Sequence, residues 1–228
     1  MARILIHVEG ETEETFVNEV LADHLRQFDH IVTPRLIGNA RLRSRRGGIR
    51  SWDSTQRDII RHLQSDPSGF ASTMVDFYGL PATGNGVWPG RREANSLPSG
   101  NKAAAVESAI SKSVSEAMGR GFDPSRFVPF VVMHEFEALL FSDVEKFAAG
   151  IGRPNLAQGF DAVRREFSSP EEINDSPETA PSKRVLRICP EYQKPIMGTL
   201  AALEIGLQKV REECPHFSGW VSRLEALP

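Results

Sequence analysis

Cysteine is scarce in this chain of 228 residues, which contains two, Cys189 and Cys214. The two lie far apart in sequence and lack the paired spacing of a zinc site. A chain of this length does not need a disulfide to be stable. We therefore expect both thiols to be reduced, as they are in the cytoplasm.

Long hydrophobic runs are also missing. No stretch reaches the roughly eighteen consecutive apolar residues that a membrane span requires, and the sequence opens directly into a strand pattern instead of a charged and apolar leader. The formal net charge is only -3, which gives no overall attraction to nucleic acid or to an anionic membrane. We expect a cytoplasmic protein without membrane contact, in which any binding of nucleic acid depends on local patches or a divalent metal.

The first strong pattern is an apolar strand that ends in acid. The run Ile4–Val8 is typical of a strand covered on both faces, as in a parallel sheet, and Glu9 follows it directly. Gly10 allows a sharp turn, and a helix with Thr12 as its N-cap and Glu13 in its positive first turn is predicted next. Ligands collect at the carboxyl ends of strands in open α/β sheets, so Glu9 lies where such folds place their chemistry. The alternative is that these acids only favour the start of a helix.

Two later strands end in the same way. The segment Phe70–Phe77 delivers Asp76 at its end, and Arg126–Met133 leads into Glu135 and Glu137. Parallel strands separated by helices bring their carboxyl ends to one edge of the sheet. We therefore expect Glu9 and Asp76 to lie within about 10 Å of each other, as ligands of shared or adjacent ions must.

The remaining segments complete an alternation of strands and helices. Residue patterns predict an edge strand at His30–Ile37, helices at Trp52–Gln64 and Lys102–Met118, and a mostly helical end at Pro195–Leu224. The predicted fold is α/β, with a mainly parallel, Rossmann-like sheet flanked by helices. We expect a core at residues 1–150 and a helical C-terminal extension at 151–228 packed on it.

Acid clusters at three strand ends predict a metal site. Carboxylates repel one another unless something positive lies among them, and hard oxygen ligands select Mg²⁺ or Mn²⁺. Such ions activate water and stabilise the leaving oxygen at a phosphodiester, and a lysine can neutralise the charge that develops. The pattern favours metal-assisted phosphoryl chemistry.

Basic residues are concentrated in two places. The stretch 41–50 is rich in arginine and glycine and is expected to form a mobile loop, which either binds a phosphate backbone or is simply a solvated surface. The segment Ser169–Arg184 contains three prolines, which rule out regular structure, and is either a linker or a helix start that meets a phosphate. Candidate contacts to nucleic acid are Arg41, Arg43, Arg45, Arg46, Arg50 and Arg184.

Several motifs resemble a known family. The segment Val8–Glu13 is similar to the first motif of Toprim domains, especially those of OLD-type (overcoming lysogenization defect) nucleases, in which a strand-end glutamate and an acid at the next helix start serve the metals. His134–Leu140 resembles the acidic Glu-x-Glu segment of those nucleases. Most of the chain, through Glu171–Asp175, Thr179–Arg184 and Cys214–Phe217, resembles the bacterial family called domain of unknown function 4276 (DUF4276), usually described as Toprim-like.

One position departs from the Toprim pattern. The second motif of Toprim domains is Asp-x-Asp, whereas this chain has Asp76-Phe77-Tyr78, with tyrosine in place of the second acid. Either Glu135, Glu137 or Asp143 holds a second ion, or only one metal binds, or the site is degenerate. We favour the first of these.

The resemblance implies a Toprim-like fold and a Mg²⁺- or Mn²⁺-dependent nuclease that cuts DNA or RNA, in phage defence with an ABC-class, OLD-like ATPase as partner. Metal ligands would then be Glu9, Glu13, Asp76, Glu137 and, as a second choice, Glu135; the catalytic residues would be Glu9, Asp76 and Lys183, the last as transition-state stabiliser. One alternative is a non-catalytic module that binds an ATPase or nucleic acid. Another, a nucleotide-binding α/β protein, is disfavoured because no glycine-rich phosphate loop follows any strand.

Overall fold

A parallel sheet forms the centre of the molecule. The computed structural model describes residues 1–38, 51–173, 176 and 178–228. Its strands lie in the order β2–β1–β3–β4, and β5 pairs with β3 further along. All pairs among the described strands are parallel. The strands are β1 (Arg3–Val8), β2 (Ile31–Leu36), β3 (Phe70–Asp76), β4 (Phe127–Val128) and β5 (Val131–Val132). The predicted edge position of β2 is confirmed.

The last predicted strand is divided into two short ones, β4 and β5, on either side of Pro129 and Phe130. Proline has no backbone N–H to donate to the neighbouring strand, so the hydrogen bonding between the strands is interrupted there. Thr73 of β3 bridges the gap, because its hydroxyl donates to the Phe130 carbonyl and accepts from the Phe130 N–H, both at 3.0 Å. The strand end that leads to Glu135 is thereby kept beside β3.

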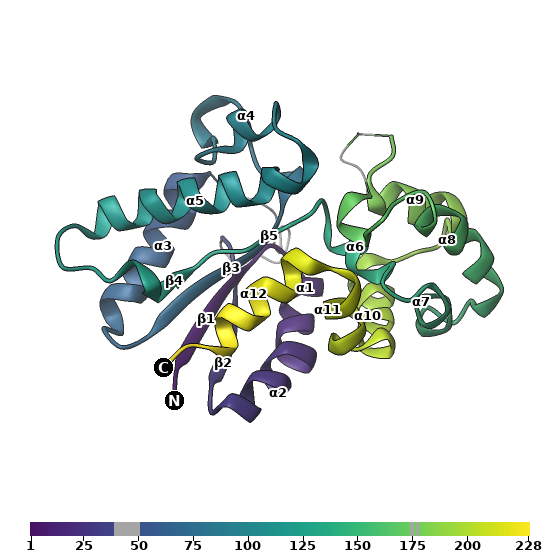
Figure 1. Cartoon of the computed structure of the whole chain (residues 1–228), viewed down its shortest axis with the longest axis horizontal. Coiled ribbons are helices and arrows are strands. Elements are labelled where there is room, and N and C mark those ends of the chain that lie inside the picture. The colour runs from purple at the N-terminus through teal and green to yellow at the C-terminus, as the bar shows by residue number, and fades with distance from the viewer. Residues whose placement is uncertain (39–50, 174–175, 177) are drawn as a thin grey trace.

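Helices cover both faces of the sheet (Figure 1). One face packs against α1 (Glu11–Phe16), its continuation through a π-helical turn (Val17–Leu21) into α2 (Ala22–Leu25), and α12 (Pro215–Glu225). The other face packs against α3 (Trp52–Ser65) and α5 (Ser99–Met118). Successive residues of β3 alternate between the two hydrophobic clusters, as expected for a strand buried on both sides. The predicted α/β fold with helices flanking a mainly parallel sheet is confirmed.

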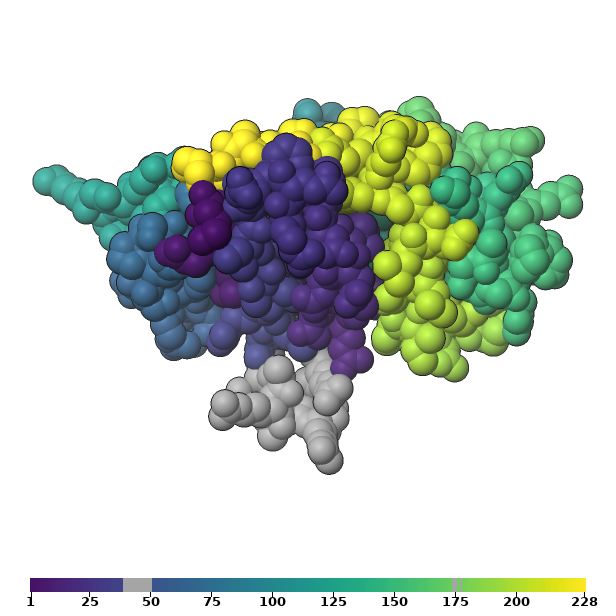
Figure 2. All heavy atoms as spheres, turned by 90° about the horizontal axis from the view of Figure 1, so that it is seen from below, coloured from purple at the N-terminus to yellow at the C-terminus, as the bar shows by residue number. Residues whose placement is uncertain are grey.

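The second half of the chain adds a group of helices beyond the carboxyl edge of the sheet (Figure 1). They are α6 (Phe136–Leu140), α7 (Val144–Gly150), α8 (Ala157–Arg164), α9 (Pro181–Ile188), α10 (Thr199–Ile205) and α11 (Leu207–Glu213); the short α4 (Arg91–Ala94) precedes α5. Figure 2 shows the α1–α2 segment lying beside α10 and α11 on one face of the molecule. None of the helices in the described ranges is long and apolar enough to cross a membrane.

The chain ends by returning to the sheet. The indole of Trp220 in α12 stacks on Phe130 with ring centroids 4.4 Å apart, and its Nε1 donates to Ser72 Oγ in β3 at 3.0 Å. One hydrophobic cluster contains residues from both sides of residue 150. A division of the chain at that residue stays a prediction.

Three local expectations have clear outcomes. Asp143 caps α7 as predicted, because its carboxylate accepts the Lys146 N–H at 3.0 Å. Thr12 is not the N-cap of the first helix; Gly10 holds that position, and Thr12 is buried in the first turn. The segment Ser169–Arg184 is not irregular throughout, because α9 begins at Pro181, where proline fits the first turn of a helix.

The crossing of α7 and α10 gives a test of packing. A Cβ added at Gly150 would lie 2.7 Å from the Cα of Ala201, a contact with backbone that a rotamer change cannot relieve. We expect Gly150→Ala to lower the free energy of unfolding by about 1–3 kcal/mol, measured by urea denaturation. Gly219→Ala, in α12 with nothing within 4 Å of the new Cβ, is the matched control and should gain about 0.5–1 kcal/mol. Equal effects of the two changes would contradict the close crossing.

Candidate active site

Two of the predicted acids meet where β1 and β3 end. These strands are direct neighbours, so Glu9 and Asp76 emerge side by side at the carboxyl edge. The backbone N–H of Asp76 donates to Glu9 Oε2 at 3.2 Å. The Asp76 carboxylate is held in turn, because its Oδ1 accepts the Phe136 N–H of α6 at 2.9 Å. The predicted proximity of Glu9 and Asp76 is confirmed.

Two helix starts bring in further carboxylates. Glu13 lies in the first turn of α1 and is 1% exposed, and Glu137 lies in the first turn of α6 and is fully buried. Gly10 makes room for Glu13, since a Cβ at position 10 would lie 3.0 Å from Glu13 Oε2. We call Glu9, Glu13, Asp76 and Glu137 the carboxylate cluster.

A lysine that the sequence analysis did not single out lies among these acids. Lys194 begins a π-helical turn (Lys194–Gly198) that leads into α10. Its Nζ lies 3.2 Å from Glu137 Oε2, 3.3 Å from Asp76 Oδ2 and 3.5 Å from Glu13 Oε1. One cation thus contacts carboxylates supplied by β3, α1 and α6.

The electrostatics follow from burial and crowding. Burial, followed by repulsion from Glu13, raises the pKa of Glu9 to about 7. Burial also raises the pKa of Asp76 and of Glu137, against the opposing attraction of Lys194. Burial alone would lower the pKa of Lys194, but the surrounding carboxylates, led by Asp76, raise it well above its ordinary value. The Lys194 ammonium therefore stays charged near neutral pH. The carboxyl groups whose pKa is raised are, by contrast, partly protonated there.

The donor atoms suit a hard divalent cation. Both oxygens of Glu137 and Oε1 of Glu13 are buried without a hydrogen-bond partner, although each residue has one oxygen in ion-pair range of Lys194. Carboxylate oxygens are the ligands that Mg²⁺ and Mn²⁺ prefer. Among the described residues, however, no three His, Cys, Asp or Glu side chains are arranged so that they could hold a metal ion. The carboxylate oxygens of the cluster therefore fit such an ion chemically. In the present arrangement, the Lys194 ammonium offsets their negative charge.

The other predicted site residues lie outside this contact. Glu135 is the N-cap residue of α6 and is half-buried, and its Oε2 accepts the Ser182 N–H at the start of α9 at 2.8 Å. Lys183, next along α9, is exposed, and the ion pairs described to the carboxylate cluster come from Lys194 instead. Asp143 is occupied as the cap of α7. Of the two acids in Glu-x-Glu, Glu137 is the one that points inward.

The predicted basic contacts are only partly described. Arg184 forms an ion pair with Glu166 at 3.0 Å and its Nε donates to the Thr179 carbonyl, so it braces the start of α9. The cluster from Arg41 to Arg50 lies outside the described residues. Its contact with nucleic acid stays a prediction.

Sequence reasoning missed Lys194 and Tyr192. Tyr192 is buried, and its hydroxyl has no hydrogen-bond partner among the described residues; burial, and after it repulsion from Glu137, raises its pKa. Both residues lie in the break between α9 and α10, where no apolar periodicity marks a strand end or a helix face. The only signal there was a lysine directly before Pro195, a residue that commonly opens a helix.

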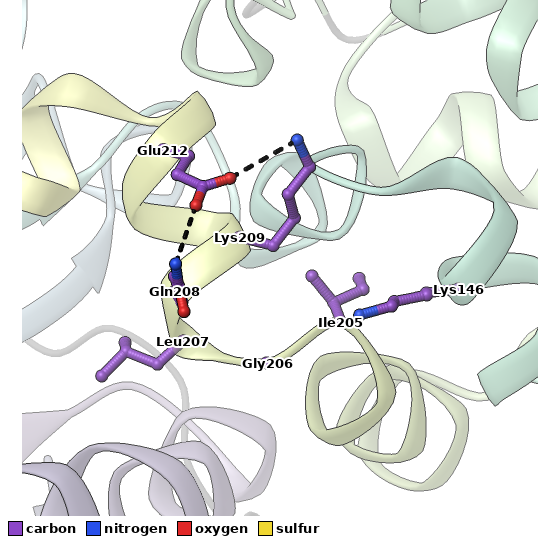
Figure 3. A pocket seen from close by; sticks show the side chains of 7 residues that line it. All are labelled: Lys146, Ile205, Gly206, Leu207, Gln208, Lys209 and Glu212. Atoms are coloured by element: carbon purple, nitrogen blue, oxygen red, sulfur yellow. Dashed lines mark hydrogen bonds and ion pairs between the residues drawn. The ribbon is translucent and has the colours of Figure 1, made fainter.

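Hollows in the surface show how the cluster is reached. One of about 240 Å³ is lined by Glu9, Gly10, Glu11, Thr12, Glu13, Lys194 and Pro195, so the half-buried Glu9 and Lys194 are reached from the α1 side. A larger hollow of about 430 Å³ lies at the junction of α10 and α11 (Figure 3). There Lys209 is already paired with Glu213 at 2.7 Å and Glu212 at 3.7 Å, and none of the predicted site residues lines it.

Comparison with known proteins identifies the family. The chain matches the family described as Domain of unknown function (DUF4276) over residues 8–225. It belongs to the DUF4276 family. The match includes the whole carboxylate cluster and Lys194, so the site lies in the part of the chain that defines this family.

Two further comparisons give no information about the activity of the protein. No curated protein matches this DUF4276 chain. Among solved structures, the C-terminal region of the Xanthomonas campestris pv. campestris OLD protein is similar, with a TM-score of 0.43 and 13% identity, covering 99% of this chain and 95% of that one. A similarity of this size gives no information about what the chain does.

Proposed function

We infer that this protein is a Mg²⁺- or Mn²⁺-dependent nuclease of Toprim type that hydrolyses phosphodiester bonds in nucleic acid. The observation that carries the proposal is the convergence of Glu13, Asp76 and Glu137 on one cation, Lys194 Nζ, beside Glu9. Four buried or nearly buried carboxylates at one sheet edge cost stability unless they serve a charged ligand. The resemblance of Val8–Glu13 to the first Toprim motif supports the same activity, and phage defence with an ATPase partner is the setting that this resemblance favours.

Each residue has a role in this proposal. Glu9, Glu13, Asp76 and Glu137 would hold the metal, which when bound would activate water and stabilise the leaving oxygen. The Phe136 N–H orients Asp76, and the Asp76 N–H orients Glu9. Lys194 would move from its place between the acids toward the phosphate, where its charge offsets the negative charge that develops. This assigns to Lys194 the role that the sequence suggested for Lys183.

A specific observation supports a second candidate. Lys194 already neutralises part of the cluster, and no ready-made metal site exists among the described residues. A non-catalytic module that binds an ATPase or nucleic acid would look the same. The two candidates differ in whether a divalent ion displaces the ammonium.

Titration with divalent ions separates these candidates. Purified protein is incubated with supercoiled plasmid and with structured RNA across a range of Mg²⁺ and Mn²⁺ concentrations, with Ca²⁺ and EDTA as controls. The nuclease proposal expects cutting that saturates with Mg²⁺ or Mn²⁺ and is absent in EDTA. If neither substrate is cut at any concentration of either ion, the non-catalytic module is the better description.

The arginine cluster provides a separate prediction about binding. Replacing Arg43, Arg45 and Arg46 with alanine should flatten the log-log dependence of affinity on salt by about two to three units on duplex DNA, because each phosphate contact adds about 0.9. Fluorescence anisotropy at several salt concentrations measures this slope, and affinity for the metal should change little. An unaltered slope would mean that these arginines are solvated or face a protein partner.

A further inference from the structure

A second hollow lies at the same edge of the sheet, and the nuclease proposal does not use it. It has a volume of about 370 Å³ and lies between the N-terminal ends of α5 and α12. Its lining includes Ser99 and Ala103 of α5, Met133 after β5, Glu171, and His216 of α12. We call it the α5–α12 cleft.

The cleft is a close neighbour of the carboxylate cluster. Met133 in its lining precedes His134, whose Nε2 lies 3.4 Å from Ser99 Oγ and whose ring contacts Phe77 edge to face. Phe77 directly follows Asp76, and the N–H of Tyr78 donates to the His134 carbonyl at 3.1 Å. These contacts connect the lining of the cleft to the segment that carries Asp76.

Contacts with Glu107 and Phe130 fix the orientation of the His216 ring. Its Nε2 lies 2.9 Å from Glu107 Oε1, and one side of its ring packs on Phe130, with centroids 5.1 Å apart and an angle of 31° between the rings. The side chain is still 28% exposed, and it lines the cleft. A ring held in this way is a ready stacking platform for another flat ring, as histidine is in proteins that bind single strands.

The acidic side chains of the cleft are hydrogen-bond acceptors. Glu171 Oε1 accepts from the Phe217 N–H and Oε2 from the His216 N–H, both at 2.9 Å, so each oxygen retains capacity for another donor. Among the described residues, the lining contains no lysine or arginine, and it includes a second carboxylate, Glu172. A phosphate is therefore disfavoured, whereas a base that presents an amino group is favoured, as carboxylates accept from the cytosine N4 amino group.

We propose that the α5–α12 cleft binds one unpaired nucleobase of the strand whose backbone lies at the carboxylate cluster. The base stacks on the exposed side of His216 and against Met133, and its amino group donates to Glu171. A paired base has neither its face nor its edge free, so the cleft selects single-stranded or flipped-out nucleotides. This inference rests on the proposed action on nucleic acid but not on hydrolysis itself.

Filling the cleft tests the proposal. Gly100 lines it and is exposed, and a Cβ there meets nothing within 4 Å, so Gly100→Trp occupies the space of a base without disturbing the core. Gly219→Trp is the matched control, because Gly219 is also exposed, helical and free of contacts within 4 Å but is outside the lining. The probes are a fluorescein-labelled oligodeoxycytidine and an abasic oligomer with the same number of phosphates, titrated by anisotropy in Ca²⁺.

The expected result is a loss of affinity that occurs in Gly100→Trp alone and only for the oligomer that carries bases. Gly100→Trp should weaken binding of the oligodeoxycytidine by about five- to 150-fold, the range of one lost base stack, and leave binding of the abasic oligomer unchanged. Gly219→Trp should change neither. Wild-type protein should itself prefer the oligodeoxycytidine to the abasic oligomer by at least about fivefold, and this comparison needs no variant.

Failure of the base site and failure of the nuclease proposal give different results. No preference of the wild-type protein for bases, or an equal loss with both oligomers in Gly100→Trp, overturns the base site even if the protein cuts nucleic acid. A base-specific loss in a protein that cuts nothing with Mg²⁺ or Mn²⁺ keeps the base site and rejects hydrolysis.

Discussion

Replacing Glu9 with glutamine is expected to reduce metal-dependent cutting by roughly a thousandfold or more while leaving the fold intact. Glutamine keeps the shape of the side chain, and its amide oxygen can still accept the Asp76 N–H. It removes the charge that a divalent ion needs at the end of β1, and loss of one such electrostatic contact costs catalysis about 10²–10³ or more. Single-turnover cleavage in Mg²⁺, together with thermal unfolding in EDTA, measures both effects.

Glu14→Gln is the appropriate control for this experiment. Glu14 lies next to Glu13 in the first turn of α1 and undergoes the same chemical change, but Lys194 pairs with Glu13 and not with Glu14. Cutting by Glu14→Gln should stay within about twofold of wild type, since ordinary substitutions outside a site have small effects. If Glu9→Gln cuts as well as Glu14→Gln, the assignment of Glu9 to the metal is wrong.

The sequence predicted the scaffold of the site well, because buried strands leave a local signature. The runs Ile4–Val8 and Phe70–Phe77 needed no tertiary information to be identified as strands, and their shared direction placed Glu9 and Asp76 together. From the sequence, Glu137 ranked ahead of Glu135, but the physical basis of that order is tertiary. It depends on α6 starting at Phe136, which turns Glu137 inward and leaves Glu135 to the start of α9.

The lysine could not be predicted for a physical reason. Lys194 reaches the cluster through a tertiary contact between elements more than a hundred residues apart in sequence, from the break before α10 to the end of β3. Lys183 was the better candidate by local pattern, because it follows a proline and a serine at a helix start, and that helix start is indeed present. The Ser182 N–H at its start donates to Glu135, however, and the side chain of Lys183 is exposed.

The central position of Lys194 leads to the second large effect. Lys194→Met keeps an apolar stem of similar length but removes the charge that lies within 3.5 Å of Glu13, Asp76 and Glu137. Uncompensated buried charges cost about 3–5 kcal/mol, and we expect the lower end because the lysine side chain is 37% exposed. At roughly 2–4 °C per kcal/mol for a chain of this size, the melting temperature in EDTA at pH 8 should fall by about 6–12 °C.

The pH dependence of this loss has a definite sign. The pKa of Glu9 is raised to about 7, and those of Asp76 and Glu137 are raised as well, so the folded state takes up protons that the unfolded state does not as the pH falls from 8 to 6. Protonation removes the repulsion that Lys194 had offset, so the difference in melting temperature between Lys194→Met and wild type should narrow at pH 6.

Mg²⁺ at pH 8 should raise the melting temperature of the variant more than that of wild type, because no ammonium competes for the carboxylates. Lys183→Met, at an exposed position, should change stability by less than about 0.5 kcal/mol. A loss in Lys194→Met that is the same at both pH values and insensitive to Mg²⁺ would show that the cluster is a structural ion-pair network and not a metal site.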